Sequence, residues 1–253
     1  MKVFTKICLI LAGILAALGI AFCIVAVGLG VRSEDLKEAT LYWDEMKNSF
    51  VSEHIGEEHF EQSYKNIKNL DIDLGAGKMV VKKGDGDQIR VRADNIKTSF
   101  VCEVKGKTLQ IKNKHHYIIG LNLWGKDTVE QIVLEIPEGM VFDEVKLELG
   151  IGEIQAEALH CSDLEIECGV GRAAISGKIT EACEITCGVG EVVLKLDNEE
   201  KEFNYLLDCD VGEITLGNHS YSGLDNSKEI DYDAEAKMKI DCGVGKVEVK
   251  FKK

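Results

Sequence analysis

The chain has 253 residues, of which 45% are hydrophobic, 25 are glycine and only one is proline, and its formal net charge is −14. So little proline excludes a collagen-like or proline-rich disordered chain. The acidic charge disfavours nucleic acid, whose phosphates it would repel, and we expect no nucleic-acid partner.

The first residues predict a membrane anchor in the form of a transmembrane helix. Residues 7–31 carry no charged side chain, and about 20 apolar residues are enough for a helix to cross a bilayer. Lys2 and Lys6 precede this segment and Arg32 follows it. The excess of basic residues on the first side predicts a cytoplasmic N-terminus, residues 1–6, and an extracytoplasmic remainder. The alternative is a signal peptide cleaved near Ala26-Val27-Gly28, although its apolar region is ordinarily shorter, about 7–15 residues.

Residues 32–66 predict a short helical stalk followed by a linker. The apolar side chains of the stalk recur at the three- and four-residue spacing of one helical face, at Leu36, Ala39, Trp43, Met46 and Phe50. We interpret Leu36, Trp43, Met46 and Phe50 as a surface for contact with a partner or for self-association. Residues 53–66 are polar and acidic, which is typical of a linker.

Six copies of one pattern follow within residues 67–253. Each copy has three alternating apolar positions, a Gly-x-Gly corner and further apolar positions, and the copies begin at Leu70, Val145, Leu164, Cys183, Tyr205 and Met238. Alternation with a period of two residues is typical of strands with one buried face. The apolar set of the third copy continues past the corner as Val170, Ala173 and Ile175, and Val244 stands in the last copy where Val170 stands in the third. We interpret the three-residue step from Val170 to Ala173 as a bulge that keeps both on the buried side.

Glycine accepts backbone conformations that other residues avoid, so the glycines of the pattern are predicted to form its corners. Asp210 replaces the first glycine of the fifth copy. The predicted corner glycines are Gly75, Gly77, Gly150, Gly152, Gly169, Gly171, Gly188, Gly190, Gly212, Gly243 and Gly245.

The spacing of the corners predicts an all-β fold, a single-stranded parallel β-solenoid (β-helix). Gly150, Gly169 and Gly188 are evenly spaced along the chain, and Asp210 follows after a slightly longer interval. These intervals correspond to coils of about 19–22 residues, close to the repeat lengths that solenoid proteins use. The residues between the first and second copies predict less regular coils at the start of the stack.

The last interval, from Asp210 to Gly243, is longer than one such coil. Its length predicts an outward loop over residues 217–236. The sixth copy would then lie at the end of the stack, where Phe251 and the terminal lysines form a charged edge.

Four of the nine cysteines occupy one position of the repeat, namely Cys168, Cys187, Cys209 and Cys242. Equivalent residues of neighbouring coils are separated by about 4.8 Å, and such a line cannot surround a zinc ion tetrahedrally at about 2.3 Å. We interpret the four as buried free thiols. A disulfide between neighbours is an alternative that the Cα separation permits but disulfide geometry disfavours.

Other candidate sites are weaker. The charged residue after each corner predicts an outward ion-pair ladder that includes Glu153, Arg172 and Glu191. His115, His116 and Tyr117 are loop candidates for a ligand. Asp225, Asp231 and Asp233 are calcium candidates, but Ile230 stands where an EF-hand has glycine. The Gly-x-Gly copies lack the third glycine and the lysine of phosphate-binding loops. We therefore predict no cofactor, metal or catalytic residue.

The run IPEGMVFDEVKLELGIGEI, followed by ECGVGRAAI and TCGVGEVVL, resembles the bacterial "putative adhesin" domain of unknown function, the β-strand-repeat family that includes LiaG-like envelope proteins. The resemblance covers residues 67–253, and the N-terminal apolar segment is also similar to that group. It implies a cell-surface or membrane-associated β-solenoid with links to adhesion or envelope stress. It implies no catalytic residue.

We therefore expect a single-pass membrane protein whose extracytoplasmic domain is a non-enzymatic scaffold that binds an envelope protein, a cell-wall polymer or another partner. One alternative is an accessory of an envelope-stress signalling system. A second is a β-helix enzyme acting on polysaccharide. The chain is acidic and its sequence indicates no basic groove, so an anionic glycan is disfavoured as a substrate.

Overall fold

The computed structural model describes residues 58–96, 100–113, 131–222 and 226–252, which belong to one compact unit, Gly56–Lys253. The predicted membrane segment 7–31, the stalk with its apolar stripe and the candidates at His115–Tyr117 lie outside these residues. No helix among the described residues is long and apolar enough to cross a membrane.

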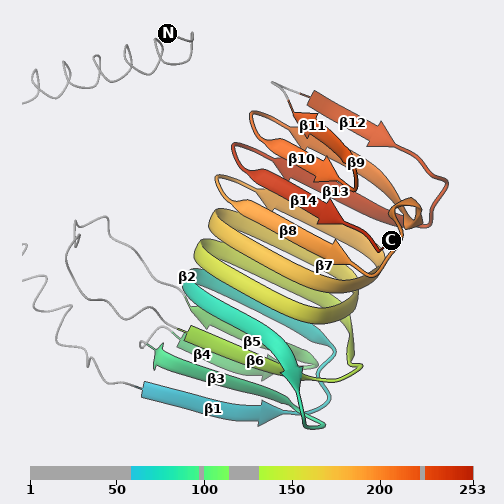
Figure 1. Ribbon diagram of the computed structural model, residues 1–253. Coiled ribbons are helices and arrows are strands. Elements are labelled where there is room, and N and C mark those ends of the chain that lie inside the picture. Colours follow the sequence, from blue (N-terminus) through green and yellow to red (C-terminus); the bar gives the residue numbers. More distant parts are fainter. Residues whose placement is uncertain (1–57, 97–99, 114–130, 223–225, 253) are drawn as a thin grey trace, which may run out of the picture. The chain divides into compact units, whose positions relative to one another are not determined.

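The all-β prediction is confirmed for the described residues (Figure 1). One 3-10 turn, η1 (Glu200–Glu202), interrupts the strands. The strands are β1 (Glu58–Tyr64), β2 (Asn69–Gly84), β3 (Ile89–Ile96), β4 (Phe100–Lys105), β5 (Thr108–Asn113), β6 (Gln131–Pro137), β7 (Val141–Cys187), β8 (Glu191–Leu196), β9 (Phe203–Cys209), β10 (Glu213–Leu216), β11 (His219–Ser222), β12 (Asn226–Ile230), β13 (Ala236–Cys242) and β14 (Lys246–Lys250).

The strands stack as successive coils because equivalent residues of the repeat pair with one another in parallel. Leu70 pairs with Val145 and Met79 with Ile154 between β2 and β7, and Ala173 pairs with Val192 between β7 and β8. The pairing is solenoid-like, because successive coils pair side by side in the same sheet. Strand β7 continues through two corners without a break.

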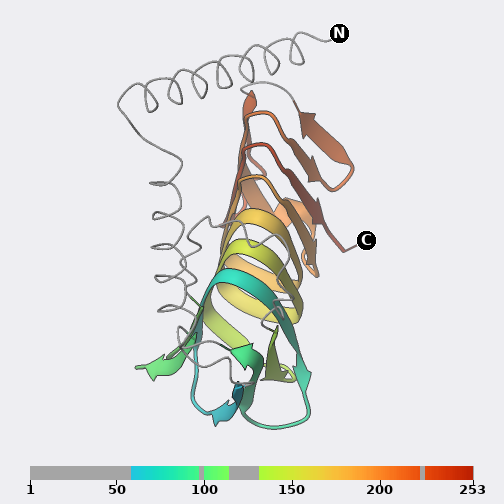
Figure 2. The same ribbon diagram turned by 90° about the vertical axis from the view of Figure 1, so that its left-hand side faces the viewer.

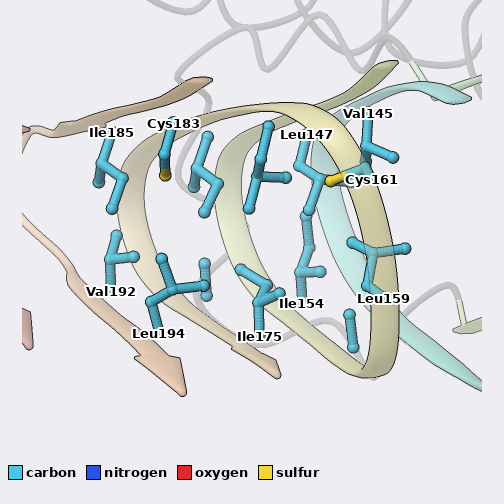
Figure 3. Close-up of a cluster of buried hydrophobic side chains, with 14 of the residues drawn as sticks. Val145, Leu147, Ile154, Leu159, Cys161, Ile175, Cys183, Ile185, Val192 and Leu194 are labelled. Atoms are coloured by element: carbon cyan, nitrogen blue, oxygen red, sulfur yellow. The ribbon is translucent and has the colours of Figure 1, made fainter. Parts of the chain in front are cut away.

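The alternation places aliphatic side chains between the two limbs of each coil. Figure 3 shows Val145, Leu147 and Ile185 on one limb pointing toward Ile154 and Leu194 on the other. All five are buried. Burial of this apolar surface, at about 25 cal/mol per Å², is the main favourable term for the stack.

The corners lie where stacked backbones approach too closely for any side chain. A Cβ on Gly152, whose φ is +137°, would lie 2.0 Å from the carbonyl oxygen of Gly77, and one on Gly171, whose φ is +142°, would lie 2.1 Å from that of Gly152. Both the contact and the backbone conformation therefore require glycine. Figure 2 looks onto this edge of the stack.

The order of the coils differs from the order of the sequence. Strand β13 pairs in parallel with β7 on one side, where Cys242 meets Cys187, and with β9 on the other, where Cys242 meets Cys209. Strand β14 likewise lies between β8 and β10. The prediction that the sixth copy ends the stack is therefore wrong, because that copy lies between the fourth and the fifth (Figure 1).

The long interval makes this exchange of order sterically accessible. The predicted outward loop over residues 217–236 instead contains β11, which pairs antiparallel with β10, and β12, which pairs antiparallel with β9. These short strands cover the outer edge of the fifth copy. The chain then has enough length to return and place β13 inside the stack.

The charged residues after the corners alternate in sign once the coils are taken in their spatial order. That order is Lys78, Glu153, Arg172, Glu191, Lys246 and Glu213. Ion pairs join the first two at 3.5 Å, the middle two at 3.0 Å and the last two at 3.7 Å. The ladder predicted from Glu153, Arg172 and Glu191 thus extends over all six copies. Each exposed pair contributes about 0–1 kcal/mol.

The start of the stack is only partly coiled. Strands β5 and β6 pair in parallel with the two halves of β2, but β4 pairs antiparallel with β5, and β3 pairs antiparallel with β6 and β1. The linker predicted over residues 53–66 is wrong for Glu58–Tyr64, which form β1. The half-buried Phe60 and the buried Tyr64 pack against the core, so the alternation continues into this segment.

We expect Gly152→Ala to lower the free energy of unfolding by about 3 kcal/mol or more, because the new Cβ would overlap a carbonyl oxygen and the backbone would be strained. Urea titration followed by circular dichroism measures this change. Gly86→Ala is the matched control, since its Cβ would meet nothing closer than 3.9 Å, and it should change stability by less than about 0.5 kcal/mol. Equal effects of the two substitutions would contradict the close approach at the corners.

Candidate functional site

A polar hollow of about 380 Å³ lies at the turn between β2 and β3. Figure 1 shows this turn near the bottom of the picture. The hollow gathers four basic side chains in a chain with an acidic net charge. The basic residues surround one glutamate of β6, and the lining consists of Ser63, Lys82, Lys83, Arg90, Arg92, Glu135 and the turn residues 84–88.

Glu135 forms the floor of the hollow. The strand register aligns it with Lys82 on one side and with Arg90 on the other. Its carboxylate accepts a hydrogen bond from Arg92 and lies 3.3 Å from Lys82 Nζ and 3.5 Å from Arg90 Nη1. Only 14% of the Glu135 side chain is exposed. Three cations thus share one carboxylate, and the two guanidinium groups have more N–H donors than that carboxylate can accept.

Four other acidic residues lie near the hollow, and together with Glu135 they outnumber its four basic side chains. Arg90 also lies 3.8 Å from Glu61, and Lys83 lies 3.1 Å from Glu138. Asp85 and Asp87 stand on the turn, exposed to solvent, and form no ion pair with any described residue. They place negative charge at the rim rather than at the floor.

The local sequence explains why the two arginines share a face. Ile89 and Val91 are buried, so Arg90 and Arg92 point to the outer face of β3 by strand alternation. The turn Gly84-Asp85-Gly86-Asp87 reverses the chain between β2 and β3. Strand β6 then inserts between β2 and β3 and brings Glu135 to the middle.

This site was not predicted from the sequence, in which no basic groove was expected. One signal was present, because two of the four arginines of the chain are Arg90 and Arg92, which follow Lys82 and Lys83 across a turn. That signal does not reveal Glu135, which is distant in the sequence and joins the cluster only through sheet pairing.

The cysteines that share one repeat position lie in a buried column in the order Cys168, Cys187, Cys242 and Cys209. The thiol of Cys187 donates to the carbonyl of Lys246, and that of Cys242 donates to the carbonyl of Glu213, each at 3.9 Å. The seven cysteines of the described residues are free. The column fills the space beneath the corner glycines.

Neighbouring thiols in this column perturb one another. Hydrogen bonding with Cys187, followed by burial, raises the pKa of Cys168 and of Cys242. Hydrogen bonds with these two neighbours lower the pKa of Cys187, which lies between them. Outside the column, burial raises the pKa of Cys161 to about 12.

A second surface feature lies at the tip of the corners. The prediction that Val170 and Val244 face the core is wrong, because both are exposed, whereas Ala173 and Val247 are buried. The chain turns between the two glycines and points the middle residue outward. The same exposed position is filled by an aliphatic side chain in five coils, which together form the corner stripe: Ile151, Val170, Val189, Val244 and Val211.

A protein-family model described as Toastrack DUF4097 matches residues 67–253. No curated protein matches the chain.

Solved structures of two bacterial proteins match the chain. A "putative cell adhesion protein" from Clostridium sporogenes superposes with a TM-score of 0.54 at 20% identity, over 77% of this chain and 99% of that one. A "putative adhesin" from Bacteroides fragilis has a TM-score of 0.39 at 14% identity, over 77% of this chain and 98% of that one. The likeness to the first structure concerns the fold alone.

We expect the six buried cysteines of the described residues to resist alkylation in the folded protein. They are Cys161, Cys168, Cys183, Cys187, Cys209 and Cys242. Cys102 is only partly buried, although burial raises its pKa to about 11, and it should be modified first. Mass spectrometry after timed iodoacetamide treatment at pH 8 measures the order, with the urea-unfolded chain as control. Faster modification of Cys187 than of Cys102 would contradict the buried column.

Proposed function

We propose that this chain, which belongs to the Toastrack DUF4097 family, is a non-enzymatic scaffold of the bacterial cell surface whose β-solenoid domain binds an anionic component of the envelope. The binding site is the hollow around Glu135. The ligand group is an oxyanion, a phosphate or a carboxylate, of the kind that envelope polymers carry.

The surplus of donors at the hollow is the observation that carries the proposal. Lys82, Arg90 and Arg92 converge on one carboxylate, which leaves guanidinium and ammonium N–H groups directed into a space of about 380 Å³. Arginine is suited to this task because its planar fork binds phosphate and carboxylate with two parallel hydrogen bonds. Each such charge-assisted bond contributes about 1.5–3 kcal/mol.

Two further observations support a binding role at the cell surface. The solved structure of similar fold from Clostridium sporogenes is named for cell adhesion. Residues 7–31 carry no charge over a length that is typical of a membrane-spanning segment, and the basic Lys2 and Lys6 before it favour a cytoplasmic N-terminus. In this proposal the domain is extracytoplasmic and meets an envelope protein or cell-wall polymer there.

We expect the full chain in detergent to bind inorganic phosphate, acetate or both, and Arg90→Gln with Arg92→Gln to weaken that binding about tenfold or more. A tenfold change corresponds to about 1.4 kcal/mol, less than one charge-assisted hydrogen bond. Isothermal titration calorimetry measures both affinities. Binding should weaken as salt is raised, because the charges are partly exposed.

Two matched variants sharpen this test. Lys65→Gln with Lys237→Gln removes the same two charges from exposed sites outside the hollow and should leave affinity nearly unchanged. Asp85→Asn with Asp87→Asn removes negative charge from the rim and should strengthen binding. If the lysine control lost as much affinity as the arginine variant, net charge alone would explain the loss, and the proposed site would be refuted.

A further inference from the structure

The corner stripe exposes hydrocarbon at a position where the fold does not need it. Its five side chains are between 50% and 62% exposed. A β-branched residue favours extended backbone, but threonine would serve that purpose equally well. All five coils instead carry valine or isoleucine, and they line up along the stack. A contiguous exposed apolar feature of this kind is typical of an interaction surface.

The flank next to the stripe has no net charge. The six-membered ladder that begins at Lys78 and ends at Glu213 lies two residues after the stripe in each coil and contains three cations and three anions. The chain as a whole carries −14. The stripe and the ladder together are therefore a region where two acidic molecules can meet without net repulsion.

The ladder is complementary to its own reversed copy. The ladder has an even number of residues, and their charges alternate in sign. A two-fold rotation that reverses the direction of the stack therefore places every charge opposite a charge of the other sign. Arg172 then faces Glu191 of the second copy, and Glu153 faces Lys246 of the second copy. A two-fold rotation that keeps the direction of the stack would instead place the ladder of the second copy on the opposite side of the stripe, away from the ladder of the first.

The other flank limits the contact. In each coil, the side chain two residues before the first residue of the corner points outward. Most of these side chains are acidic, including Glu148, Glu167 and Asp241. Two such columns repel, so the contact is confined to the stripe and the ladder. A contact confined to these two columns is narrow, as is typical of weak, transient interfaces, which bury less than about 1,200 Å².

We propose that two copies of this chain associate in antiparallel orientation through the corner stripe, with the charge ladder setting the register. The contact is isologous, so it closes as a dimer and does not continue into a fibre. Val170 of one copy meets Val189 of the other at its centre. This proposal is independent of anion binding, but a dimer would present two hollows and raise avidity for a repetitive polymer.

The test uses the full chain in detergent with the photo-crosslinking residue p-benzoylphenylalanine at position 189. Position 141 is the matched control, because Val141 and Val189 are both valines that are 61% exposed, and Val141 lies outside the stripe. Irradiation of a mixture of isotopically light and heavy chains distinguishes contacts between copies from contacts within one copy. Mass spectrometry then identifies the crosslinked peptide.

We expect position 189 to give a mixed light–heavy dimer joined to the peptide that contains Val170, and position 141 to give none. Arg172→Glu should reduce the dimer yield about tenfold, and combining it with Glu191→Arg should restore it. Crosslinks from position 189 only to other proteins, no crosslink at all, or equal yield from position 141 would each overturn the proposal. A dimer joined near Val189 itself would overturn the antiparallel register.

Discussion

The close approach of stacked backbones at the corners is the constraint on which the rest of the structure depends. The carbonyl oxygen of Gly152 would lie 2.1 Å from a Cβ on Gly171, and that of Gly190 would lie 2.3 Å from a Cβ on Gly245. Because only glycine fits at these positions, the chain turns within three residues, and in five of the six coils the middle residue of the turn points outward. One steric condition thus accounts for both the glycine columns and the exposed corner stripe.

Stacking also aligns the residues of one repeat position in a column, so neighbouring members of that column interact with one another. The buried thiols form a line in which Cys187 lies between two neighbours that perturb its pKa. The charged position after the corner forms a ladder whose signs alternate from Lys78 to Glu213 in spatial order. In sequence order Glu191 and Glu213 would be adjacent with like charges. The insertion of the sixth copy removes that repulsion.

The repeat could be read from the sequence, whereas its spatial order and the hollow could not. Alternation at Leu164, Ile166 and Cys168 predicts strands because the period of two is a local property. The placement of β13 beside β7 depends on pairing between residues that are far apart in the sequence, and the sign pattern of the ladder was the one clue to it. The cluster at Glu135 required β3 to pair antiparallel with β6. The outward turn of Val170 was missed because a bulge and a corner give the same spacing.

The exchanged order of the fifth and sixth copies is the central structural claim, and disulfide trapping tests it directly. Equivalent residues of adjacent coils are about 4.8 Å apart at Cα, within the range of about 4.4–6.8 Å that a disulfide spans, whereas residues two coils apart are outside it. Under mild oxidation of the full chain, Glu191→Cys with Lys246→Cys should form a crosslink, and Glu191→Cys with Glu213→Cys should not. A crosslink between positions 191 and 213, without one between 191 and 246, would contradict the account.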